Sequence, residues 1–520
     1  MLRYSPRFVT LGLLANLLFL GTPLLFGAPE RPNVLLICVD DLRPVLGCYG
    51  GAAKTPNLDR LSESAVTFQR HYVQFPSCGP SRACMMGGIR PNTLSLDGNA
   101  GVGVIADAPE TRPTMPLHFR NNGYTTLSFG KTYHSKGSGP GFGWSEAPWH
   151  PPCGWTCYVN VDPPKAKGQW QPAFEIYDGP DSAHGDYQTA DQAIAAMEKH
   201  KYRAFFIAAG FYKPHLPFVA PKKYWDLYDR DKIKRLEPLA VPENARLYQY
   251  TFREICAYGM EEGKLFTPDI MPTPAQAREL IHAYYAAVSF NDAQVGRLLK
   301  KLDDLGLADK TVVVVWSDHG FHLGDQSRWA KWTQFEADMR SPMMIRLPDK
   351  DQKPRSTHAL VESVDLYPTL ADYCGIELPA HLAGTSLVPL LKGKVDRVKE
   401  VAYSQVRTLK KNSHLLAYSM RTPQYRYIEW RDTTQNCKLV EMELYDLGLL
   451  GTETRNVVAD PAYEKALKAC AKLSAHGYPP DFGLRARTQK ERRNEINLII
   501  LCYRTPIPPV APSCKYPGLG

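Results

Sequence analysis

The chain alternates short, continuous apolar runs with longer segments of amphipathic pattern. The clearest apolar run is NVLLICVD at residues 33–40, and a continuous run of this length predicts a strand that is buried on both faces of a sheet. Four further runs have the same character: TTLSFGK (125–131), AFFIAAGF (204–211), TVVVVWSD (311–318) and PMMIRLP (342–348). Strands separated by helical segments indicate an α/β fold, with a large, mostly parallel sheet flanked by helices on both faces.

Two helices are predicted between these strands. The segment TPNLDRLSESAVTF at residues 55–68 has Pro56 near its start and charges on one face, which is typical of a capped helix. A longer periodic pattern predicts a helix from about Ala275 to Asp304.

The pattern changes after about Lys394. YSMRTPQYRYIEW (418–430) and MELYDL (442–447) predict short antiparallel strands, and a helix is predicted over Pro461–Ala475. The predicted organisation is a main domain at 30–394, a smaller C-terminal α+β subdomain at 395–483 with a small antiparallel sheet, and a basic, Pro-rich, disordered tail at 484–520.

The N-terminus has the layout of a secretory signal peptide over residues 1–28. Two arginines precede an apolar run from Phe8, and the small residues Gly27 and Ala28 follow it. The run is long, so an uncleaved membrane anchor is the alternative, but Pro23 and the small residues favour cleavage. We expect export to the periplasm or the cell exterior, without stable membrane insertion, because no later segment is long and apolar enough to span a bilayer.

The formal net charge of +9 is concentrated at the two ends of the chain. The segment 484–520 carries seven Arg or Lys and two Glu, and two more arginines lie in the first ten residues. The remainder is nearly balanced, so the sequence does not indicate a nucleic-acid-binding protein.

Twelve cysteines in an exported chain permit disulfides. Cys153 and Cys157, in HPPCGWTC, are candidates for a local pair. Further candidates are Cys374, Cys437 and Cys470, whose pairing the sequence leaves open. A zinc site that adds His150 to Cys153 and Cys157 is the alternative for this motif, but three ligands are one short of a structural zinc site.

Acidic residues follow two of the predicted strands. Asp40-Asp41 ends the first apolar run, and Asp318-His319 ends the fourth. Ligands of open α/β sheets bind at the carboxyl ends of the strands, and oxygen-rich ligands suit calcium or magnesium better than zinc. One such pair alone is more often a turn or a helix cap. Two pairs, each directly after a buried strand, indicate a cation site.

Basic side chains follow the same strands. Lys131 and His134 come after the second run, Lys213 and His215 after the third, and Lys331 shortly after the fourth. A lone surface Lys is usually solvated and a lone His is usually structural. A basic group behind each of three strands instead indicates an anionic substrate beside the cation, with groups that offset charge and transfer protons.

The segment SCGPSRACMMGG at residues 77–88 resembles the signature C-x-P-S-R-x-x-x-x-x-G of the type I sulfatase family. The resemblance covers roughly residues 31–458 and is closest to the iduronate-2-sulfatase-like branch. It is seen in GKTYH (130–134), in FFIAAGFYKPHLPF (205–218) and in the block from SDHG to WAKW (317–332). This resemblance implies an alkaline-phosphatase-like fold, with residues 30–394 as the catalytic domain.

The resemblance also implies roles for the site residues. In this family a formylglycine-generating enzyme oxidises the signature cysteine, so Cys78 would become a formylglycine whose hydrate is the nucleophile, and Arg82 would hold it in place. The implied metal ligands, around calcium or alternatively magnesium, are Asp40, Asp41, Cys78, Asp318 and His319. The implied sulfate-binding and proton-transfer residues are Lys131, His134, His215 and Lys331.

The activity that the resemblance implies is that of a sulfatase, a sulfuric ester hydrolase that removes sulfate from a sulfated carbohydrate. Two alternatives stay open: a phosphodiesterase or phosphonate monoester hydrolase with the same groups, and a non-catalytic glycan-binding protein if Cys78 is unmodified. Variable loops such as 144–161 and 178–186 would set specificity, and Phe321 stands where the related branch has an aromatic residue, which implies a sugar ring nearby.

One residue departs from the family pattern. The family usually has Thr before the last glycine of the signature, and Gly87 stands there instead. The residues that the maturing enzyme reads, Cys78, Pro80 and Arg82, are intact, so we expect maturation.

Overall fold

Seven strands form the central sheet, in the order β11-β2-β10-β7-β1-β5-β3. Their bounds in the computed structural model are β11 (Arg355–Glu362), β2 (Val66–Tyr72), β10 (Met343–Arg346), β7 (Thr311–Ser317), β1 (Asn33–Val39), β5 (Phe205–Phe211) and β3 (Thr125–Gly130). All five strands predicted from the apolar runs are therefore present in this sheet.

The structure describes Met1 and residues 31–477, with short gaps. The gaps are 95, 97, 100–101, 135–139, 163–169, 247, 249–253, 268–269, 349–351, 409–413 and 450. The predicted signal peptide at 1–28 and the predicted basic tail at 484–520 lie outside the described residues and stay predictions.

The sheet is mostly parallel, as predicted, with one exception. β1 runs parallel to β5 and β7, β3 runs parallel to β5, and β11 runs parallel to β2. β10 is antiparallel to both of its neighbours, β2 and β7. The connection from β7 to β10 contains the β8–β9 hairpin (His322–Leu323, Trp329–Ala330), a short 3-10 helix within it (Asp325–Ser327) and the one-turn helix α7 (Glu336–Met339). Without a crossover helix, the chain returns beside β7 in the opposite direction.

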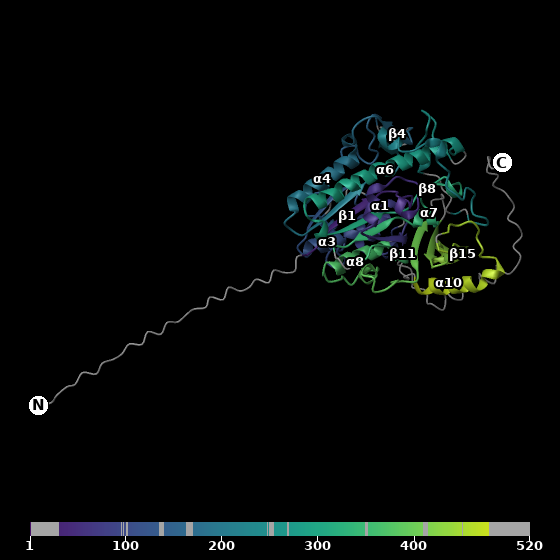
Figure 1. Cartoon of the computed structure of the whole chain (residues 1–520). Helices are drawn as coiled ribbons and strands as arrows, with labels where there is room; N and C mark the ends of the chain where they lie inside the picture. The colour runs from purple at the N-terminus through teal and green to yellow at the C-terminus, as the bar shows by residue number, and fades with distance from the viewer. Residues whose placement is uncertain are drawn as a thin grey trace. The chain divides into compact units, whose positions relative to one another are not determined.

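Two hydrophobic layers enclose the central sheet. Side chains of β1 alternate between them: Leu35, Ile37 and Val39 belong to one cluster, and Val34, Leu36 and Cys38 belong to the other. Helices α4 (Gly185–His200) and α6 (Pro274–Asp304) cover the first face, and α3 (Met115–Asn121) and α8 (Leu366–Tyr373) cover the second (Figure 1). Helix α6 confirms the long helix expected from the sequence.

Five further α-helices and a further pair of strands lie in the described part of the chain. The other helices are α1 (Pro56–Ser62), α2 (Cys78–Gly87), α5 (Lys222–Trp225), α9 (Val388–Leu391) and α10 (Glu464–Gly477). β4 (Phe174–Tyr177) and β6 (Phe218–Pro221) form a separate parallel pair.

The prediction of a helix over residues 55–68 is correct in the first half of the segment and wrong in the second half. Helix α1 ends at Ser62, and β2 begins at Val66. Every residue of β2 is buried, although Thr67, Gln69, Arg70 and His71 are polar. Their partners lie on neighbouring elements; the ring of His71, for example, bonds the Ser341 carbonyl at 3.1 Å and the Ser363 hydroxyl at 2.9 Å. The polar residues break the apolar run by which the other strands were recognised.

A four-stranded antiparallel sheet follows in the C-terminal part of the chain. Its strands are β12 (Ala402–Arg407), β13 (Leu415–Arg421), β14 (Tyr425–Asp432) and β15 (Lys438–Asp446). Phe75 and Phe335 share a buried cluster with Trp430 and Tyr445 of this sheet. The C-terminal sheet is therefore present as expected, while the boundary at 394/395 stays a prediction.

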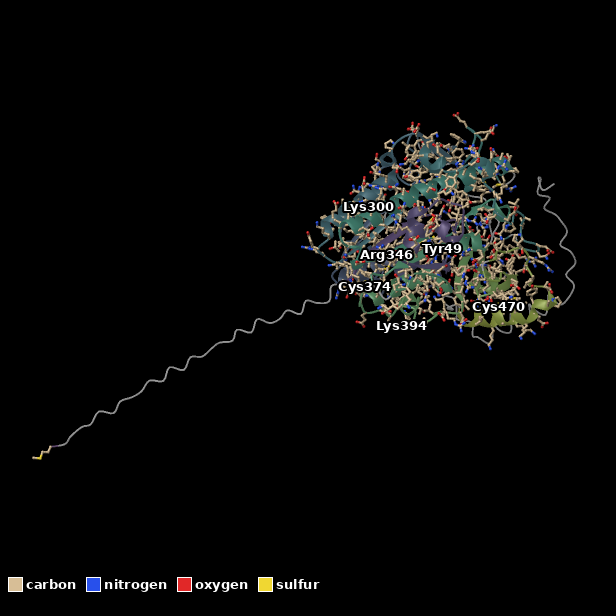
Figure 2. All side chains as sticks on the ribbon, viewed as in Figure 1. Tyr49, Lys300, Arg346, Cys374, Lys394 and Cys470 are labelled. Atoms are coloured by element: carbon tan, nitrogen blue, oxygen red, sulfur yellow. The ribbon has the colours of Figure 1, made fainter. Side chains whose placement is uncertain are left out.

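Two cysteines proposed as disulfide candidates are in different cores. Cys374 lies in the core beside the central sheet, and Cys470 lies on α10 against the C-terminal sheet. Figure 2 shows the two residues well apart, so they do not pair with each other. In the part of the chain that the structure describes, no helix has the length and apolarity needed to cross a membrane.

Candidate active site

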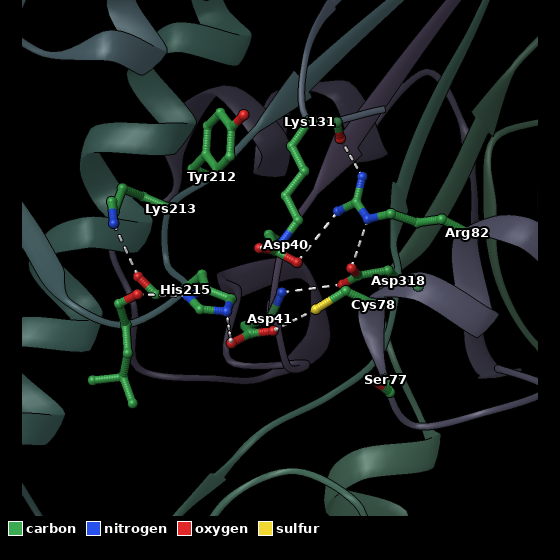
Figure 3. A network of polar contacts seen from close by, with 12 residues as sticks. Asp40, Asp41, Ser77, Cys78, Arg82, Lys131, Tyr212, Lys213, His215 and Asp318 are labelled. Carbon is green, nitrogen blue, oxygen red and sulfur yellow. Dashed lines mark hydrogen bonds and ion pairs between the residues drawn. The ribbon is translucent and has the colours of Figure 1, made fainter. Parts of the chain in front are cut away.

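The acidic residues predicted as ligands meet at the carboxyl edge of the central sheet. β1 and β7 are adjacent and parallel, with Val39 opposite Ser317, so the residues that follow both strands emerge together. Asp41 has a left-handed backbone (φ 59°), and its N–H donates to Asp318 Oδ1 at 3.1 Å. This turn directs Asp40, Asp41 and Asp318 to one buried point (Figure 3).

Cys78 is the first residue of the wholly buried helix α2. Asn99 holds this end of the helix: its Oδ1 accepts hydrogen bonds from the Ser77 hydroxyl at 2.9 Å and from the Gly79 N–H at 3.0 Å. At the other end, Gly88 has a left-handed backbone (φ 65°), and a Cβ there would overlap the side chain of Leu382. The last glycine of the signature is thus required where the helix stops.

Arg82 lies one turn after Cys78 and joins the acidic residues to the helix. Its guanidinium bonds Asp318 Oδ2 at 2.8 Å, Asp40 Oδ1 at 3.4 Å and the carbonyl of Lys131 (Figure 3). Arg82 is completely buried. It therefore compensates two buried carboxylates and fixes the orientation of α2 relative to β1, β3 and β7.

The predicted basic residues surround Cys78 Sγ. Lys331 Nζ and His319 Nε2 each lie 3.3 Å from the sulfur. Lys331 Nζ also bonds Asp41 Oδ1 at 2.7 Å, and Lys131 Nζ is paired with Asp40. His134 is exposed, and it contributes, after Lys131, Lys331 and His319, to lowering the pKa of the Cys78 thiol.

Lys331 is held in an unusual turn. The residues on either side of it, Ala330 (φ 68°) and Trp332 (φ 84°), both have left-handed backbones. Bulky residues rarely adopt this conformation, and such strain is typical of functional sites. The turn is supported by Asp338 Oδ2, which accepts from the Thr333 N–H at 2.7 Å.

His215 and Lys213 have different roles, although they are two residues apart. Lys213 is buried, and its ammonium donates to the carbonyls of Thr156, His215 and Pro217 at 2.8–3.1 Å, which makes it a structural residue. His215 Nδ1 donates to the Leu216 carbonyl at 2.5 Å. Its Nε2 is left facing Asp41 Oδ2 at 3.9 Å.

The charges of the site shift the pKa of Cys78. Burial alone would raise the pKa of this thiol. The positive charges of Lys131, Lys331 and His319 outweigh burial, so its pKa lies well below the ordinary value. The Cys78 thiol is therefore held in its anionic form.

The neighbouring groups are shifted in the same electrostatic field. Burial raises the pKa of Asp318 to about 7, despite the opposing charge of Arg82. Burial lowers the pKa of His319, but Asp318 and Cys78 more than offset this and raise it to about 10.

The acidic residues fit a divalent cation. Two sets of possible ligand atoms each lie within 4.8 Å of one another: Asp40, Asp41, Cys78 and His215, and Asp40, Cys78, Asp318 and His319. Asp41 Oδ2 is buried and accepts no hydrogen bond from the described residues. Such an oxygen is costly unless a cation or a donor meets it. His319 Nδ1 donates to the Gly320 carbonyl at 2.8 Å, which leaves Nε2 as its ligand atom.

The sequence reasoning missed Glu254. Its Oε1 lies 3.2 Å from His215 Nε2 and 3.1 Å from Lys331 Nζ. Burial raises the pKa of Glu254, but Lys331 and His215 outweigh burial and lower it to about 2. Glu254 follows none of the predicted strands, and no motif around it indicates a site.

The expectation of a sugar ring beside Phe321 is wrong. Phe321 is completely buried, and its ring is stacked on Tyr284 with centroids 5.9 Å apart. Its carbonyl accepts a hydrogen bond from Arg43 at 2.9 Å. The aromatic residue is therefore part of the core behind the site.

A sheet that gathers possible metal ligands and cationic residues at its carboxyl edge is typical of hydrolases with an alkaline-phosphatase-like fold. A structure of this class, the phosphonate monoester hydrolase from Silicibacter pomeroyi, superimposes with a TM-score of 0.68 at 26% identity, over 89% of this chain and 100% of that one. Its likeness supports the fold described above.

The family is set by the sequence comparisons. The family profile described as Sulfatase matches residues 32–376, and that described as N-sulphoglucosamine sulphohydrolase, C-terminal, matches residues 324–475. Iduronate 2-sulfatase of Homo sapiens is 31% identical over 76% of this chain and 84% of its own length, and that of Mus musculus is 34% identical over 68% and 70%. The chain belongs to the sulfatase family and is a sulfuric ester hydrolase.

Proposed function

We propose that this enzyme removes sulfate from a sulfated carbohydrate, using a formylglycine derived from Cys78 and a bound divalent cation. The observation that carries the proposal is the position of Cys78. Its Sγ lies 3.3 Å from both Lys331 Nζ and His319 Nε2 and belongs to both sets of possible metal ligands. A nucleophile, a cation site and positive charge for a sulfate group thus converge on one atom.

The substrate class is supported by the names of relatives. Two of them are iduronate 2-sulfatases, and a protein of Bacteroides thetaiotaomicron that is 27% identical over 85% of this chain is named Delta 4,5-hexuronate-2-O-sulfatase. A sulfated saccharide that contains a uronic acid is therefore the first candidate substrate.

The proposed metal ligands are Asp40, Asp41, Asp318, His319 and the modified Cys78. Carboxylate oxygens favour Ca²⁺, with Mg²⁺ as the second candidate. When bound there, the cation would polarise the sulfate oxygens and lower the pKa of the attacking hydroxyl.

A thiol at position 78 would form a sulfated adduct that has no easy route to release sulfate. An aldehyde hydrate has such a route, because its second hydroxyl can re-form the carbonyl and expel sulfate. One hydroxyl of the Cys78-derived hydrate attacks sulfur, the ester S–O bond breaks, and the alcohol leaves with a proton from His215 or Lys331. The second hydroxyl then loses its proton, to His134 in this proposal. The carbonyl re-forms and sulfate leaves, and addition of one water molecule to the aldehyde restores the hydrate.

The remaining charged residues hold the reacting groups. Arg82 bonds two of the proposed ligands, Asp40 and Asp318, and so orients the residue at position 78 on α2. Lys131 and Lys331 lie where a sulfate beside Cys78 would need counter-charges. A formylglycine-generating enzyme is the proposed maturation partner, and export is the proposed destination.

Peptide mass spectrometry of the exported enzyme tests the nucleophile. The peptide that spans residues 77–90 is expected to lose the mass that separates a CH₂–SH side chain from an aldehyde. Cys78→Ser serves as the matched control, and we expect its sulfate release to fall by a factor on the order of 10³ or more. An active preparation in which the residue 78 thiol is unmodified would refute the proposal.

A phosphonate monoester hydrolase is the second candidate, because the Silicibacter pomeroyi enzyme of that name shares the fold at 26% identity. Matched aryl esters of sulfate and of a phosphonate distinguish the two. We expect kcat/KM to be higher for the sulfate ester, and a preference for the phosphonate would favour the second candidate.

A further inference from the structure

The segment at residues 149–157 contacts the candidate active site at His215. It begins beside β3, where the Trp149 N–H donates to the Ser128 carbonyl at 3.0 Å and the Gly130 N–H donates to the Trp149 carbonyl at 2.8 Å. At its far end Trp155 packs edge-on against the ring of His215, with centroids 5.6 Å apart. Trp155 is nevertheless 45% exposed. A large aromatic side chain therefore contacts a proposed catalytic histidine and also faces solvent.

Two cysteines flank this tryptophan in the sequence, each two residues away from it. Cys153 Sγ and Cys157 Sγ are 2.7 Å apart, which is closer than two sulfur atoms pack without a bond or a shared proton. Cys153 is partly exposed and Cys157 is completely buried. The first residue of α4 is Gly185, and a Cβ there would overlap the Cys153 sulfur and contact that of Cys157. The absence of a side chain at this position makes room for the sulfur pair.

The same segment is tied to the backbone around His215. The Lys213 ammonium donates to the Thr156 carbonyl at 3.1 Å and to the His215 carbonyl at 3.1 Å. Any change in the position of residues 153–157 would therefore alter the position of Trp155 relative to His215.

We infer that Cys153 and Cys157 form a disulfide that fixes Trp155 as a wall of the substrate pocket, against which a sugar ring stacks. Indole faces pack well against apolar surfaces while their edges contact polar groups, which suits a sugar whose sulfate points toward residue 78. The sugar contact rests on the proposed function, whereas the disulfide does not.

Forming this disulfide needs an oxidant that carries a disulfide of its own. The oxidant is either a small disulfide such as oxidised glutathione or an oxidised dithiol–disulfide oxidoreductase. The thiolate of the accessible Cys153 attacks one sulfur of the oxidant and releases one oxidant thiol. Cys157 then attacks Cys153 Sγ in the mixed disulfide and releases the second. Two protein thiols lose two electrons and two protons, and the oxidant disulfide is reduced to two thiols. The hydrogen bond with Cys157 lowers the pKa of Cys153, which favours the first step.

Thiol mapping of the exported, full-length enzyme tests the disulfide. The enzyme is equilibrated with oxidised glutathione, denatured and alkylated, with and without a reductant. We expect Cys153 and Cys157 to be alkylated only after reduction, while Cys84, which is buried in the core, is alkylated in both cases. Alkylation of both cysteines without reduction would overturn the inference. So would a zinc ion that is released when these two thiols are alkylated.

Binding of a sulfated uronate disaccharide tests the pocket wall. It is measured by calorimetry in a Cys78→Ala background, which does not turn the ligand over. We expect Trp155→Ala to raise Kd roughly 3- to 10-fold and Trp155→Phe to restore most of the affinity. Cys153→Ser combined with Cys157→Ser is expected to weaken binding roughly 2- to 5-fold, because the loop loses its cross-link. Tyr202→Ala, at an exposed aromatic residue near the opposite edge of the sheet, is the matched control.

An unchanged Kd in the Trp155→Ala variant would overturn the inference that Trp155 forms a wall of the substrate pocket. Failure of the proposed function gives a different result: the enzyme with Cys78 would release no sulfate from the disaccharide, while Kd would still depend on Trp155.

Discussion

Glu254 places a negative charge between two cationic side chains that face residue 78. One carboxylate oxygen is within 3.2 Å of both His215 Nε2 and Lys331 Nζ. Burial lowers the pKa of His215, but Asp41 more than offsets this and raises it to about 10. The pKa of Lys331 is raised by Asp41, Cys78 and Glu254 against the effect of burial. The contacts with Glu254 also orient both side chains toward the site. Glu254 thus acts through His215 and Lys331, as a positioning residue.

Replacing Glu254 by Gln is expected to lower kcat about tenfold with a smaller change in KM, because both proposed proton-transfer groups lose one of their two anionic partners and keep only Asp41. Steady-state kinetics on a sulfated disaccharide measure both values. Glu254→Asp keeps the charge and is expected to recover part of kcat. A variant that keeps the kcat of the parent enzyme would show that the contact is incidental.

The orphaned Oδ2 of Asp41 makes the site sensitive to cations. Saturating Ca²⁺ added to a chelator-treated enzyme is expected to raise Tm by roughly 3–5 °C, because a ligand that binds only the folded state stabilises it. Differential scanning fluorimetry measures the shift. Asp41→Asn should remove most of it, and an equal shift in both proteins would place the cation elsewhere.

At the scale of elements, the end of helix α2 is tied to strand β11 by a buried carboxylate. Glu362 receives two hydrogen bonds from Arg90, both at 2.8 Å, and a third from Lys399 at 2.7 Å. Burial raises the pKa of Glu362, but Arg90 and Lys399 outweigh it, and the pKa lies below its ordinary value. The interaction holds the helix that begins at Cys78 against the edge of the sheet.

Glu362→Gln is expected to lower the free energy of unfolding by about 3 kcal/mol, because it leaves two partly buried cations, Arg90 and Lys399, without this partner. The folded pKa is below the unfolded value of about 4.5, so this contribution is complete above pH 4.5 and is lost as the pH falls further. Urea unfolding of both proteins at pH 7 and at pH 4 measures it. A difference that does not shrink at pH 4 would contradict the ionic origin.

The strands that the sequence predicted are those with uninterrupted apolar runs, such as β1 and β7, and the residues after them do converge. β2 could not be recognised because its polar side chains are satisfied only by distant segments, as His71 is by Ser341 and Ser363. Glu254 was missed for a similar reason. Its position in the site depends on the path of a long connection, which a local pattern does not record.

At the scale of the whole molecule, the C-terminal sheet is joined to the rest of the chain by buried hydrogen bonds and ion pairs. The Gln405 N–H of β12 donates to the Gln74 carbonyl at 2.9 Å. Glu336, ahead of β10, is paired with Arg421 and Arg426 of the C-terminal sheet, and all three are buried. Buried charges in such a network are costly to separate.

We therefore expect a single cooperative unfolding transition in differential scanning calorimetry, and no soluble product from a chain that ends at the predicted boundary, Lys394. The physical reason is that separation would expose the cluster around Trp430 and Phe335 and would leave Glu336 buried without its partners. Two resolved transitions would instead indicate that the C-terminal sheet folds on its own.

The burial of helix α2 also bears on whether Cys78 is modified before or after the chain folds. All ten of its residues are buried, and Cys78 is only 2% exposed, so a second protein has no access to the signature once the chain has folded. Under the proposed function, conversion of Cys78 would have to precede folding and compete with it. A chain that folds first would remain inactive until it unfolds again, and the yield of active enzyme would depend on the rate at which the nascent chain folds as much as on its sequence.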